Sequence, residues 1–276
     1  MLDEELSAHY QHGSLLAAIE LGLRELGITR KNLRADDLSA VEEFHVGGRQ
    51  ASIEFLDQLA IREDQHYLDI GCGIGGTARL LASSYKAKIT GVDLSGEYIE
   101  TGRVLCNWLG LEQKISLQQG NVLQCGFDDA TFDGACMLHV GMNIQDKKAL
   151  FKEVARVLKP GSYFGIYDVM SVGDDELAYP LPWASDKATS FVDSPGLYRN
   201  ELKSAGFSIV SERNRGEFAI DFFSRLKKKS QAATKKPALG LHILMGESAA
   251  LKVKNMVANI SAERIAPYEI IACIEG

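Results

Sequence analysis

The feature that most constrains this chain is a glycine-rich turn placed between a strand-like run and a helical pattern. Residues 67–77 read YLDIGCGIGGT. Glycine adopts positive φ without steric cost and lets a ligand approach the backbone closely, which a Cβ would prevent. Gly71, Gly73 and Gly76 satisfy the G-x-G-x-x-G spacing, and an acidic residue, Asp93, follows about twenty residues further on. The spacing predicts a nucleoside-binding loop, although a tight turn that binds no ligand can have the same sequence pattern.

Short apolar runs alternate with helical patterns around this turn. The strand-like runs are His66–Ile70, Lys88–Val92, Ile115–Gln118, Phe132–Leu138, Ser162–Val169, Phe207–Arg213 and Tyr268–Ile274. The helical patterns between them are Gly75–Ser84, Ser95–Leu109, Asp146–Leu158 and Gly196–Ala205. Strands that alternate with helices of this length indicate βαβ units. We therefore expect an α/β fold with a Rossmann-like, seven-stranded, mostly parallel sheet and helices on both faces.

Further helical patterns lie outside this alternation, before the first strand and before the last one. They are Leu6–Leu26, Arg49–Ala60, Phe218–Lys229 and Leu239–Asn259. We expect residues 1–62 to form an N-terminal helical cap on a second unit, residues 63–276. Within that unit, an insertion at about 215–262 would help to shape a substrate pocket.

Two carboxylates near the turn separate the cofactors that it could hold. Asp93 ends the second strand, where it can accept hydrogen bonds from both hydroxyls of a ribose; Ser95 makes the alternative role of helix N-cap redundant. Asp69 would repel a pyrophosphate but suits a cationic amino acid or sulfonium. The loop also contains no basic residue that could pair with phosphate. These features favour S-adenosylmethionine over a dinucleotide.

At these positions the chain resembles the class I S-adenosylmethionine-dependent methyltransferases. DIGCGIG at residues 69–75 is similar to the family's first motif, D-x-G-x-G-x-G, and Asp93 to its ribose-binding acid. QGNV at residues 119–122 resembles the segment that usually reads G-D-A; Asn121 stands where the family has an acid that contacts the adenine amino group. FDGACMLHV at residues 132–140 resembles the fourth strand, whose end faces the methyl group.

The resemblance implies a site for S-adenosylmethionine, with S-adenosylhomocysteine as its product, and no metal. The cofactor-binding residues that it implies are Asp69, Gly71, Cys72, Gly73, Gly75, Gly76, Asp93, Leu94, Asn121, Val122, Leu138, Phe44, Gly47 and Gly48.

The segment FHVGGR at residues 44–49 suggests a subgroup. It is similar to an S-G-G-type segment of small-molecule N-methyltransferases of the glycine/sarcosine/dimethylglycine and phosphoethanolamine type, and the insertion before the last strand is also like theirs. Related quinone, tocopherol and sterol C-methyltransferases share much of this pattern. The resemblance implies methyl transfer to an amine such as sarcosine or dimethylglycine, with C- or O-methylation of a quinone, phenol or other small metabolite as the alternative.

Methyl transfer from a sulfonium is an in-line displacement, so the protein mainly has to position the reactants. An amine must be unprotonated to attack, and a nearby proton acceptor or an apolar pocket would help. The catalytic candidates are His139 at the end of the fourth strand, Tyr167 at the end of the fifth, and Tyr10 in the N-terminal helical segment before the first strand, called the helical preface below. His139 could equally be a packed or surface histidine without a catalytic role. For Tyr10 the alternative role is helix packing.

Composition excludes several other classes. The net charge is −7 and the pI about 5.5, which argues against a basic nucleic-acid-binding surface. The 5 cysteines form no C-x-x-C pair, so neither a zinc site nor a disulfide framework is indicated. No apolar run approaches the ~20 residues of a membrane span, and an acidic N-terminus does not resemble a signal peptide. We expect a soluble, cytoplasmic protein that acts on a small molecule, with a homodimer left open.

Three other functions were weighed against methyl transfer. A nicotinamide-dependent oxidoreductase would carry a proton-relay pair such as Tyr-x-x-x-Lys, which this sequence lacks. A nucleic-acid methyltransferase acting on a base amine usually has an N/D-P-P-aromatic stretch after the fourth strand, where this chain reads HVGMN at residues 139–143. A non-catalytic protein that binds S-adenosylmethionine remains open.

Overall fold

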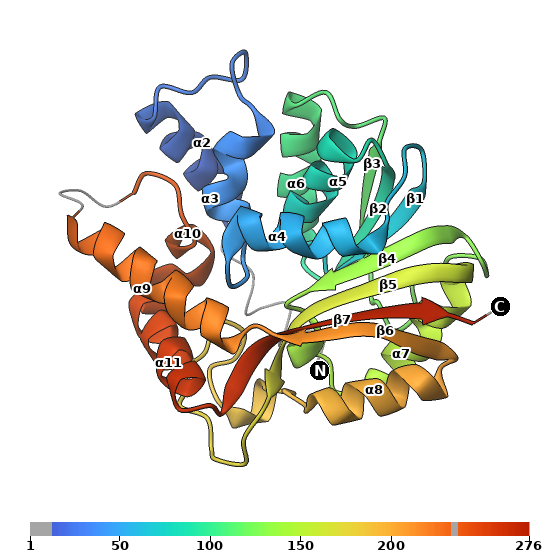
Figure 1. Ribbon diagram of the computed structural model, residues 1–276. Helices are drawn as coiled ribbons and strands as arrows, with labels where there is room; N and C mark the ends of the chain where they lie inside the picture. Colours follow the sequence, from blue (N-terminus) through green and yellow to red (C-terminus); the bar gives the residue numbers. More distant parts are fainter. Residues whose placement is uncertain (1–12, 233–236, 276) are drawn as a thin grey trace.

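The computed structural model describes residues 13–232 and 237–275, and a seven-stranded sheet forms its centre (Figure 1). The strands lie in the order β3-β2-β1-β4-β5-β7-β6. Their bounds are β1 His66–Ile70, β2 Lys88–Asp93, β3 Ile115–Gln119, β4 Phe132–Leu138, β5 Leu158–Ser171, β6 Phe207–Asn214 and β7 Ile265–Ile274. The first five strands pair in parallel, and β7 runs antiparallel to both β5 and β6. The expected α/β fold with a mostly parallel sheet is confirmed.

Helices cover both faces of the sheet, which explains why its strands read as apolar runs. One face packs against α4 (Gly48–Leu56), α5 (Gly76–Ser84) and α6 (Gly96–Trp108) in a single buried cluster. A second cluster joins the other face to α7 (Lys147–Val157) and α8 (Pro195–Ser204). The four helices expected between strands are all present.

The segment before β1 is helical, as expected. It contains α2 (Leu15–Glu25), the 3₁₀ turn η1 (Ala35–Leu38), α3 (Ser39–Glu42), α4 and the 3₁₀ turn η2 (Asp57–Leu59). The expected helix over Leu6–Leu26 is described from Leu15 onward, and Tyr10 lies outside the described residues. Leu15 and Ile19 of α2 share a buried cluster with Leu105 of α6, so this segment is packed onto the sheet domain.

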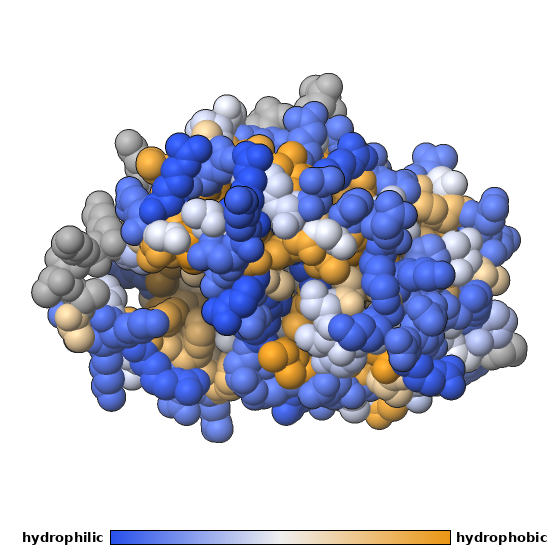
Figure 2. Space-filling model, turned by 90° about the horizontal axis from the view of Figure 1, so that it is seen from above, coloured by the Kyte–Doolittle hydropathy of each residue, from blue (hydrophilic) through white to orange (hydrophobic). Residues whose placement is uncertain are grey.

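The segment between β6 and β7 is helical over most of its described length. It contains α9 (Gly216–Ala232), α10 (His242–Met245), the 3₁₀ turn η5 (Gly246–Ser248) and α11 (Ala249–Ser261). The mostly helical stretch expected over Leu239–Asn259 thus consists of α10, η5 and α11. Gly246, with φ +67°, ends α10 and turns the chain, because a left-handed backbone cannot continue a right-handed helix. In Figure 2, apolar side chains gather in a hollow on the side where Figure 1 places α9.

Strand β5 begins four residues earlier than expected. Leu158 already pairs with Phe132, and the register shifts before Gly134 pairs with Tyr163. Gly161 in this irregular stretch has φ +77°, a conformation that suits glycine in a bulge. Beyond the bulge the carboxyl ends of β1, β2 and β4 meet at one edge of the sheet. No helix among residues 13–232 and 237–275 is long and apolar enough to cross a membrane.

Candidate active site

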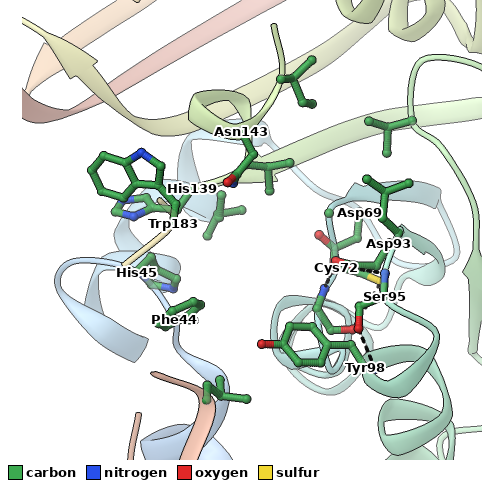
Figure 3. Close-up of a pocket in the computed structure, with 18 of the residues that line it drawn as sticks. Phe44, His45, Asp69, Cys72, Asp93, Ser95, Tyr98, His139, Asn143 and Trp183 are labelled. Carbon is green, nitrogen blue, oxygen red and sulfur yellow. Dashed lines mark hydrogen bonds between the residues drawn. The ribbon is translucent and has the colours of Figure 1, made fainter. Parts of the chain in front are cut away.

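A cavity of about 730 Å³ lies at this edge of the sheet. Its walls come from the glycine-rich turn, the loops after β2, β3 and β4, the segment 42–45 of the helical preface, and residues between 183 and 191. Figure 3 shows Asp69, Asp93 and Ser95 on one side of the cavity and Phe44, His45, His139 and Trp183 on the other. The cavity thus has a carboxylate-bearing side and a side of aromatic rings.

Close packing behind the turn requires glycine at two positions. A Cβ on Gly71, whose φ is +65°, would lie 2.3 Å from Cγ2 of Val140 in the loop after β4. A Cβ on Gly76 would lie 2.9 Å from Cβ of Glu42 in α3. Both distances are shorter than side chains tolerate, so the glycines let these two segments approach the turn. The cavity is shaped by that approach.

Asp93 ties the turn to the end of β2. The N–H of Gly73 donates to Oδ2 of Asp93 at 2.9 Å, and the N–H of Ser95 donates to Oδ1 at 2.9 Å. Burial raises the pKa of Asp93, while the two backbone donors oppose that rise. Ser95 caps α6 by accepting from the N–H of Tyr98 at 3.3 Å, which confirms the expected N-cap. Each oxygen of Asp93 therefore keeps a lone pair that a ligand hydroxyl can use.

Asp69 is the buried carboxylate on the same wall. It is 2% exposed, and its Oδ2 has no hydrogen-bond partner among the described residues. The Cys136 thiol donates weakly to Oδ1 at 3.8 Å. Burial and the nearby Asp93 raise the pKa of Asp69 to about 7. A cationic ligand group beside Oδ2 would satisfy this oxygen and lower the pKa again.

His139 faces the cavity from the end of β4 with a left-handed backbone, φ +54°. Its N–H donates to the carbonyl of Tyr167 at 2.6 Å, and its ring lies 5.1 Å from the Tyr167 ring and 5.8 Å from the His45 ring. Nε2 of His139 is buried without a partner in the described part of the chain. Burial, assisted by His45, lowers the pKa of His139 well below its usual value. The ring is therefore a neutral imidazole with a free nitrogen.

Comparison with known proteins identifies the domain that builds this cavity. Residues 68–166 match a family model described as a methyltransferase domain. This part of the chain is therefore a methyltransferase domain. The matched span contains the glycine-rich turn, Asp93 and the loops after β3 and β4, which are the segments that supply most of the cavity's polar side chains.

Relatives that match part of this chain have several specificities. An O-methyltransferase of Pyrenophora dematioidea is 30% identical over 159 residues, 58% of each chain. A sterol 24-C-methyltransferase of Aspergillus fumigatus is 34% identical over 111 residues, 40% of this chain and 29% of that one. The match therefore spans little more than half the length of one relative and under a third of the other.

A solved structure with the same fold is a putative sarcosine dimethylglycine methyltransferase from Galdieria sulphuraria. It superposes with a TM-score of 0.67 at 21% identity, covering 82% of this chain and 86% of that one. At this level of identity the likeness supports the fold of the methyltransferase and leaves its acceptor undecided.

The cavity of the methyltransferase brings together most of the residues expected to hold the cofactor. Those that line it are Asp69, Gly71, Cys72, Gly73, Gly76, Asp93, Leu94, Asn121, Val122, Leu138 and Phe44. Asn121 uses its amide oxygen to accept from the N–H of Leu123 at 2.8 Å.

Three of the expected glycines lie behind the cavity and do not line it. Gly47, with φ +99°, is the N-cap of α4, and a Cβ there would meet Ala51 and the Phe218 ring. Gly48 follows it as the first residue of α4. Gly75, with φ +84°, is the N-cap of α5. Positive φ and helix starts explain the glycines at these positions, and their contact with the cofactor stays a prediction.

Tyr167 also requires a correction. Its side chain is fully buried and does not line the cavity. Its hydroxyl donates to the carbonyl of Val46 at 2.8 Å, so it joins β5 to the helical preface. The aromatic ring stands behind His139 and supports it. We therefore assign Tyr167 a positioning role in place of the expected catalytic one, and Tyr10 stays a prediction.

An ion-pair cluster that no sequence pattern predicts closes one wall. Glu42 of α3 lines the cavity, and its Oε2 accepts from Nε of the buried Arg79 at 3.2 Å, while its Oε1 accepts from Arg49 at 3.0 Å. Nη1 of Arg79 also donates to the carbonyl of Ile74 within the turn at 2.8 Å. Because Glu42 and Arg79 lie 37 residues apart in sequence, no local motif predicts their pairing.

The segment between β5 and α8 was missed as well. Trp183 and Phe191 from this segment line the cavity, together with Ser185, Asp186 and Thr189. The indole N–H of Trp183 donates to Oγ of Ser190 at 3.0 Å, which fixes the ring. The segment has neither helical nor alternating periodicity, so the only available signal was the presence of large aromatic residues in a polar stretch.

Proposed function

We propose that this protein transfers a methyl group from S-adenosylmethionine to a small-molecule acceptor held in the same cavity. The observation that carries the proposal is the buried wall on which Asp69, the glycine-rich turn and Asp93 lie together. An unpartnered carboxylate oxygen suits a cation, and a second carboxylate at the end of β2 suits the hydroxyls of a ribose. S-adenosylmethionine carries both of these groups.

Each cofactor group has a matching part of this wall. Asp93 would accept from the ribose hydroxyls, and Asp69 would face the cationic amino-acid end. Asn121 and Val122 would line the adenine. The backbone of the turn accepts a close approach because glycine stands at 71 and 73.

The bound cofactor supplies an activated methyl group on a sulfonium, and the residues of this chain supply alignment. Positioning of two reactants in one cavity contributes about 7–11 kcal/mol to a displacement of this kind. The preface, through Glu42, Phe44 and His45, covers the cavity and excludes water from the reacting centre. We retain the division into a cap over residues 1–62 and a catalytic unit over residues 63–276 as part of this proposal.

The charges that line the cavity bear on the acceptor. None of the described residues that line it is Lys or Arg, whereas Glu42, Asp69, Asp93, Asp146 and Asp186 are acidic. Sarcosine and dimethylglycine carry a carboxylate, which needs a cationic partner when it is taken out of water. The lining therefore favours the alternative acceptor class, an uncharged metabolite such as a phenol or quinone.

Binding and turnover measurements test the proposal. We expect isothermal titration to detect S-adenosylmethionine and S-adenosylhomocysteine and to detect no binding of NAD. Transfer of a tritiated methyl group to a panel of phenols, quinones and amines should label at least one acceptor. Binding of NAD in place of S-adenosylmethionine would contradict the cofactor, and cofactor binding without transfer to any acceptor would favour a non-catalytic binding protein.

A further inference from the structure

The carboxyl-terminal end of α9 projects from the rest of the protein. All side chains of residues 224–232 are exposed, whereas Ala219 near the start of the helix is buried. Figure 1 shows this end of α9 (orange) extending to the outer edge of the molecule. The described chain therefore covers no face of the last two turns of α9.

Apolar side chains occupy more of α9 than packing on the sheet domain requires. Over residues 217–226, six apolar residues cover an arc of about 200°, whereas a helix that packs on one body shows an apolar stripe of roughly 100°. Ile220 and Leu226 in this arc are 46% and 44% exposed. The neighbouring helix α11 adds Leu251, which is 47% exposed. This edge of the protein therefore presents apolar surface to solvent.

The same end of α9 is basic, in a chain whose net charge is −7. Residues 225–229 read RLKKK, and between Asp221 and Glu247 the sequence has six Lys and Arg but no acidic residue. With 3.6 residues per turn, Lys227 and Lys229 fall at the two borders of the apolar arc. In Figure 2, hydrophilic side chains border the apolar hollow on this side of the molecule.

We propose that the exposed end of α9 docks this protein on the surface of a bilayer that contains anionic lipid. Helices that lie in a membrane interface insert apolar side chains about 5–10 Å deep, while Lys and Arg on their borders pair with anionic headgroups. Ile220 and Leu226 would enter the acyl boundary. The stems of Lys227 and Lys229 would lie along these apolar residues and carry their ammonium groups to the headgroups.

The combination of side chains favours lipid over other partners. A nucleic acid would pair with the lysines, but it would leave Ile220, Leu226 and Leu251 in water. A symmetric dimer through α9 would bury these apolar residues and set the two lysine clusters against each other. An anionic bilayer buries the apolar residues and neutralises the lysines in one contact.

The cavity lining agrees with this partner. Phe44, Trp183, Phe191 and Leu244 give the cavity an apolar wall, and its described lining contains no Lys or Arg. Uncharged, apolar molecules that suit such a wall also partition into lipid. Leu244 belongs to α10, which follows α9 in the chain, so the docking helix and part of the cavity wall come from the same segment between β6 and β7.

The test measures co-sedimentation of the full chain with lipid vesicles. We expect binding to phosphatidylcholine vesicles that contain about 30% phosphatidylserine, and none to phosphatidylcholine alone. Raising NaCl from about 0.1 M to about 0.5 M should weaken the binding, because salt screens the headgroup charge. The inference goes beyond the proposed function, since vesicle binding requires neither cofactor nor acceptor.

Two variants of α9 separate the basic from the apolar contribution. The triple variant Lys227→Gln/Lys228→Gln/Lys229→Gln should weaken vesicle binding about 100-fold, because each cation near an anionic surface contributes roughly fivefold. Ile220→Gln/Leu226→Gln should weaken it about tenfold or more, because the inserted side chains are lost. Glutamine is a good helix former and these positions are exposed, so circular dichroism and Tm should match wild type.

Matched controls remove the same kinds of side chain from other parts of the surface. Lys148→Gln/Lys152→Gln/Lys203→Gln removes three exposed charges from α7 and α8. Leu197→Gln/Val210→Gln removes exposed apolar side chains from α8 and β6. Both controls should bind the vesicles as wild type does.

Several outcomes would overturn the proposal. Failure to bind vesicles with phosphatidylserine, or equal binding to phosphatidylcholine alone, would exclude an anionic bilayer as the partner. Wild-type binding by Ile220→Gln/Leu226→Gln would show a basic patch for any polyanion, and equal losses in the controls would show a general charge effect. A dimer in sedimentation velocity that Ile220→Gln/Leu226→Gln abolishes would mean that a second copy of the chain covers this surface.

Discussion

At the scale of single residues, the two carboxylates of the cofactor wall differ in what they are bonded to. Asp93 receives two backbone N–H groups, whereas one oxygen of Asp69 has no partner in the described chain. Burial and the nearby charge of Asp93 raise the pKa of Asp69 to about 7. Asp69 is therefore the residue whose ionisation a cationic ligand changes.

The affinity for S-adenosylmethionine should depend on pH through Asp69. Below pH 7 the free protein holds a proton on this carboxyl, and a cationic ligand favours the ionised form. Binding must then release the proton, so we expect the Kd to fall as pH rises from about 6 to 8. Titration calorimetry in two buffers of different ionisation enthalpy measures the released proton. Asp69→Asn should remove the pH dependence of the Kd. If the Kd changes with pH equally in wild type and variant, Asp69 is not the group that releases the proton.

Asp93 should contribute to cofactor affinity at every pH in this range. Asp93→Ala removes a charged acceptor from the ribose hydroxyls and frees the N–H groups of Gly73 and Ser95. We expect a loss of about 1.5–3 kcal/mol in binding, roughly 10–150-fold in Kd, by calorimetry. Asp133→Asn is a matched control, because this carboxylate pairs with Lys159 at the opposite end of the sheet. An unchanged Kd for Asp93→Ala would exclude it from the ribose site.

The sequence predicts the roles of Asp69 and Asp93 better than it predicts the role of Tyr167. Asp69 and the glycines lie in one continuous motif, and Asp93 follows at the spacing that this motif predicts. Tyr167 is level with Leu138, the last residue of β4, but its hydroxyl donates to the carbonyl of Val46, which lies 121 residues away. A partner so distant in sequence leaves no local pattern, so strand ends are predictable and hydrogen-bond partners are not.

At the scale of elements, the joint between α3 and α5 connects the helical preface to the cofactor turn. Glu42 of α3 pairs with Arg79 of α5, and both side chains have 0% exposure. Gly76, the first residue of α5, leaves the space that Glu42 occupies. The preface is thus attached directly to the helix that begins at the turn, and movement of one displaces the other.

Breaking this joint should destabilise the whole fold. Glu42→Ala leaves the guanidinium of Arg79 buried without its counter-charge, which costs about 3–5 kcal/mol in unfolding free energy. Urea unfolding followed by circular dichroism measures the loss. The double variant Glu42→Gln/Arg79→Met removes both charges and should recover most of the stability.

An exposed ion pair provides the control for this effect. Lys187 and Glu176 lie 3.4 Å apart, with side chains that are 80% and 89% exposed. Lys187→Ala should cost about 1 kcal/mol or less, because solvent screens such a pair. A similar small loss for Glu42→Ala would show that the buried pair does not hold the preface in place.

The elements themselves divide into predictable and unpredictable ones. The strands and the helices between them follow from apolar periodicity, since each buries a continuous face. The segment that carries Trp183 has no such period, although it supplies part of the acceptor wall. The pattern over Leu239–Asn259 predicts helix without locating the break at Gly246, because a glycine within a helical pattern is often tolerated.

At the scale of the whole molecule, the cavity is built from segments that are distant in the chain. Phe44 comes from the preface, Asp93 from the sheet, Trp183 from the segment after β5, and Leu244 from α10. The net charge of −7 agrees with the acidic lining, which favours cationic and neutral ligands over anionic ones. Composition argued only against a nucleic-acid-binding surface, whereas the fold shows which segments meet at the cavity.

A ligand that fills this cavity should stabilise the molecule as one unit. A ligand that binds only the native state, at a free concentration 100 times its Kd, adds about 2.7 kcal/mol to the unfolding free energy. For a chain of this size class, each kcal/mol raises the Tm by about 2–4 °C, so we expect S-adenosylmethionine to raise it by roughly 5–10 °C. Differential scanning fluorimetry with increasing cofactor measures the shift. NAD at the same concentration should leave the Tm unchanged, because Asp69 and the lack of Lys and Arg in the described lining disfavour its pyrophosphate. A shift with NAD equal to that with S-adenosylmethionine would mean that the carboxylate wall does not select the cofactor.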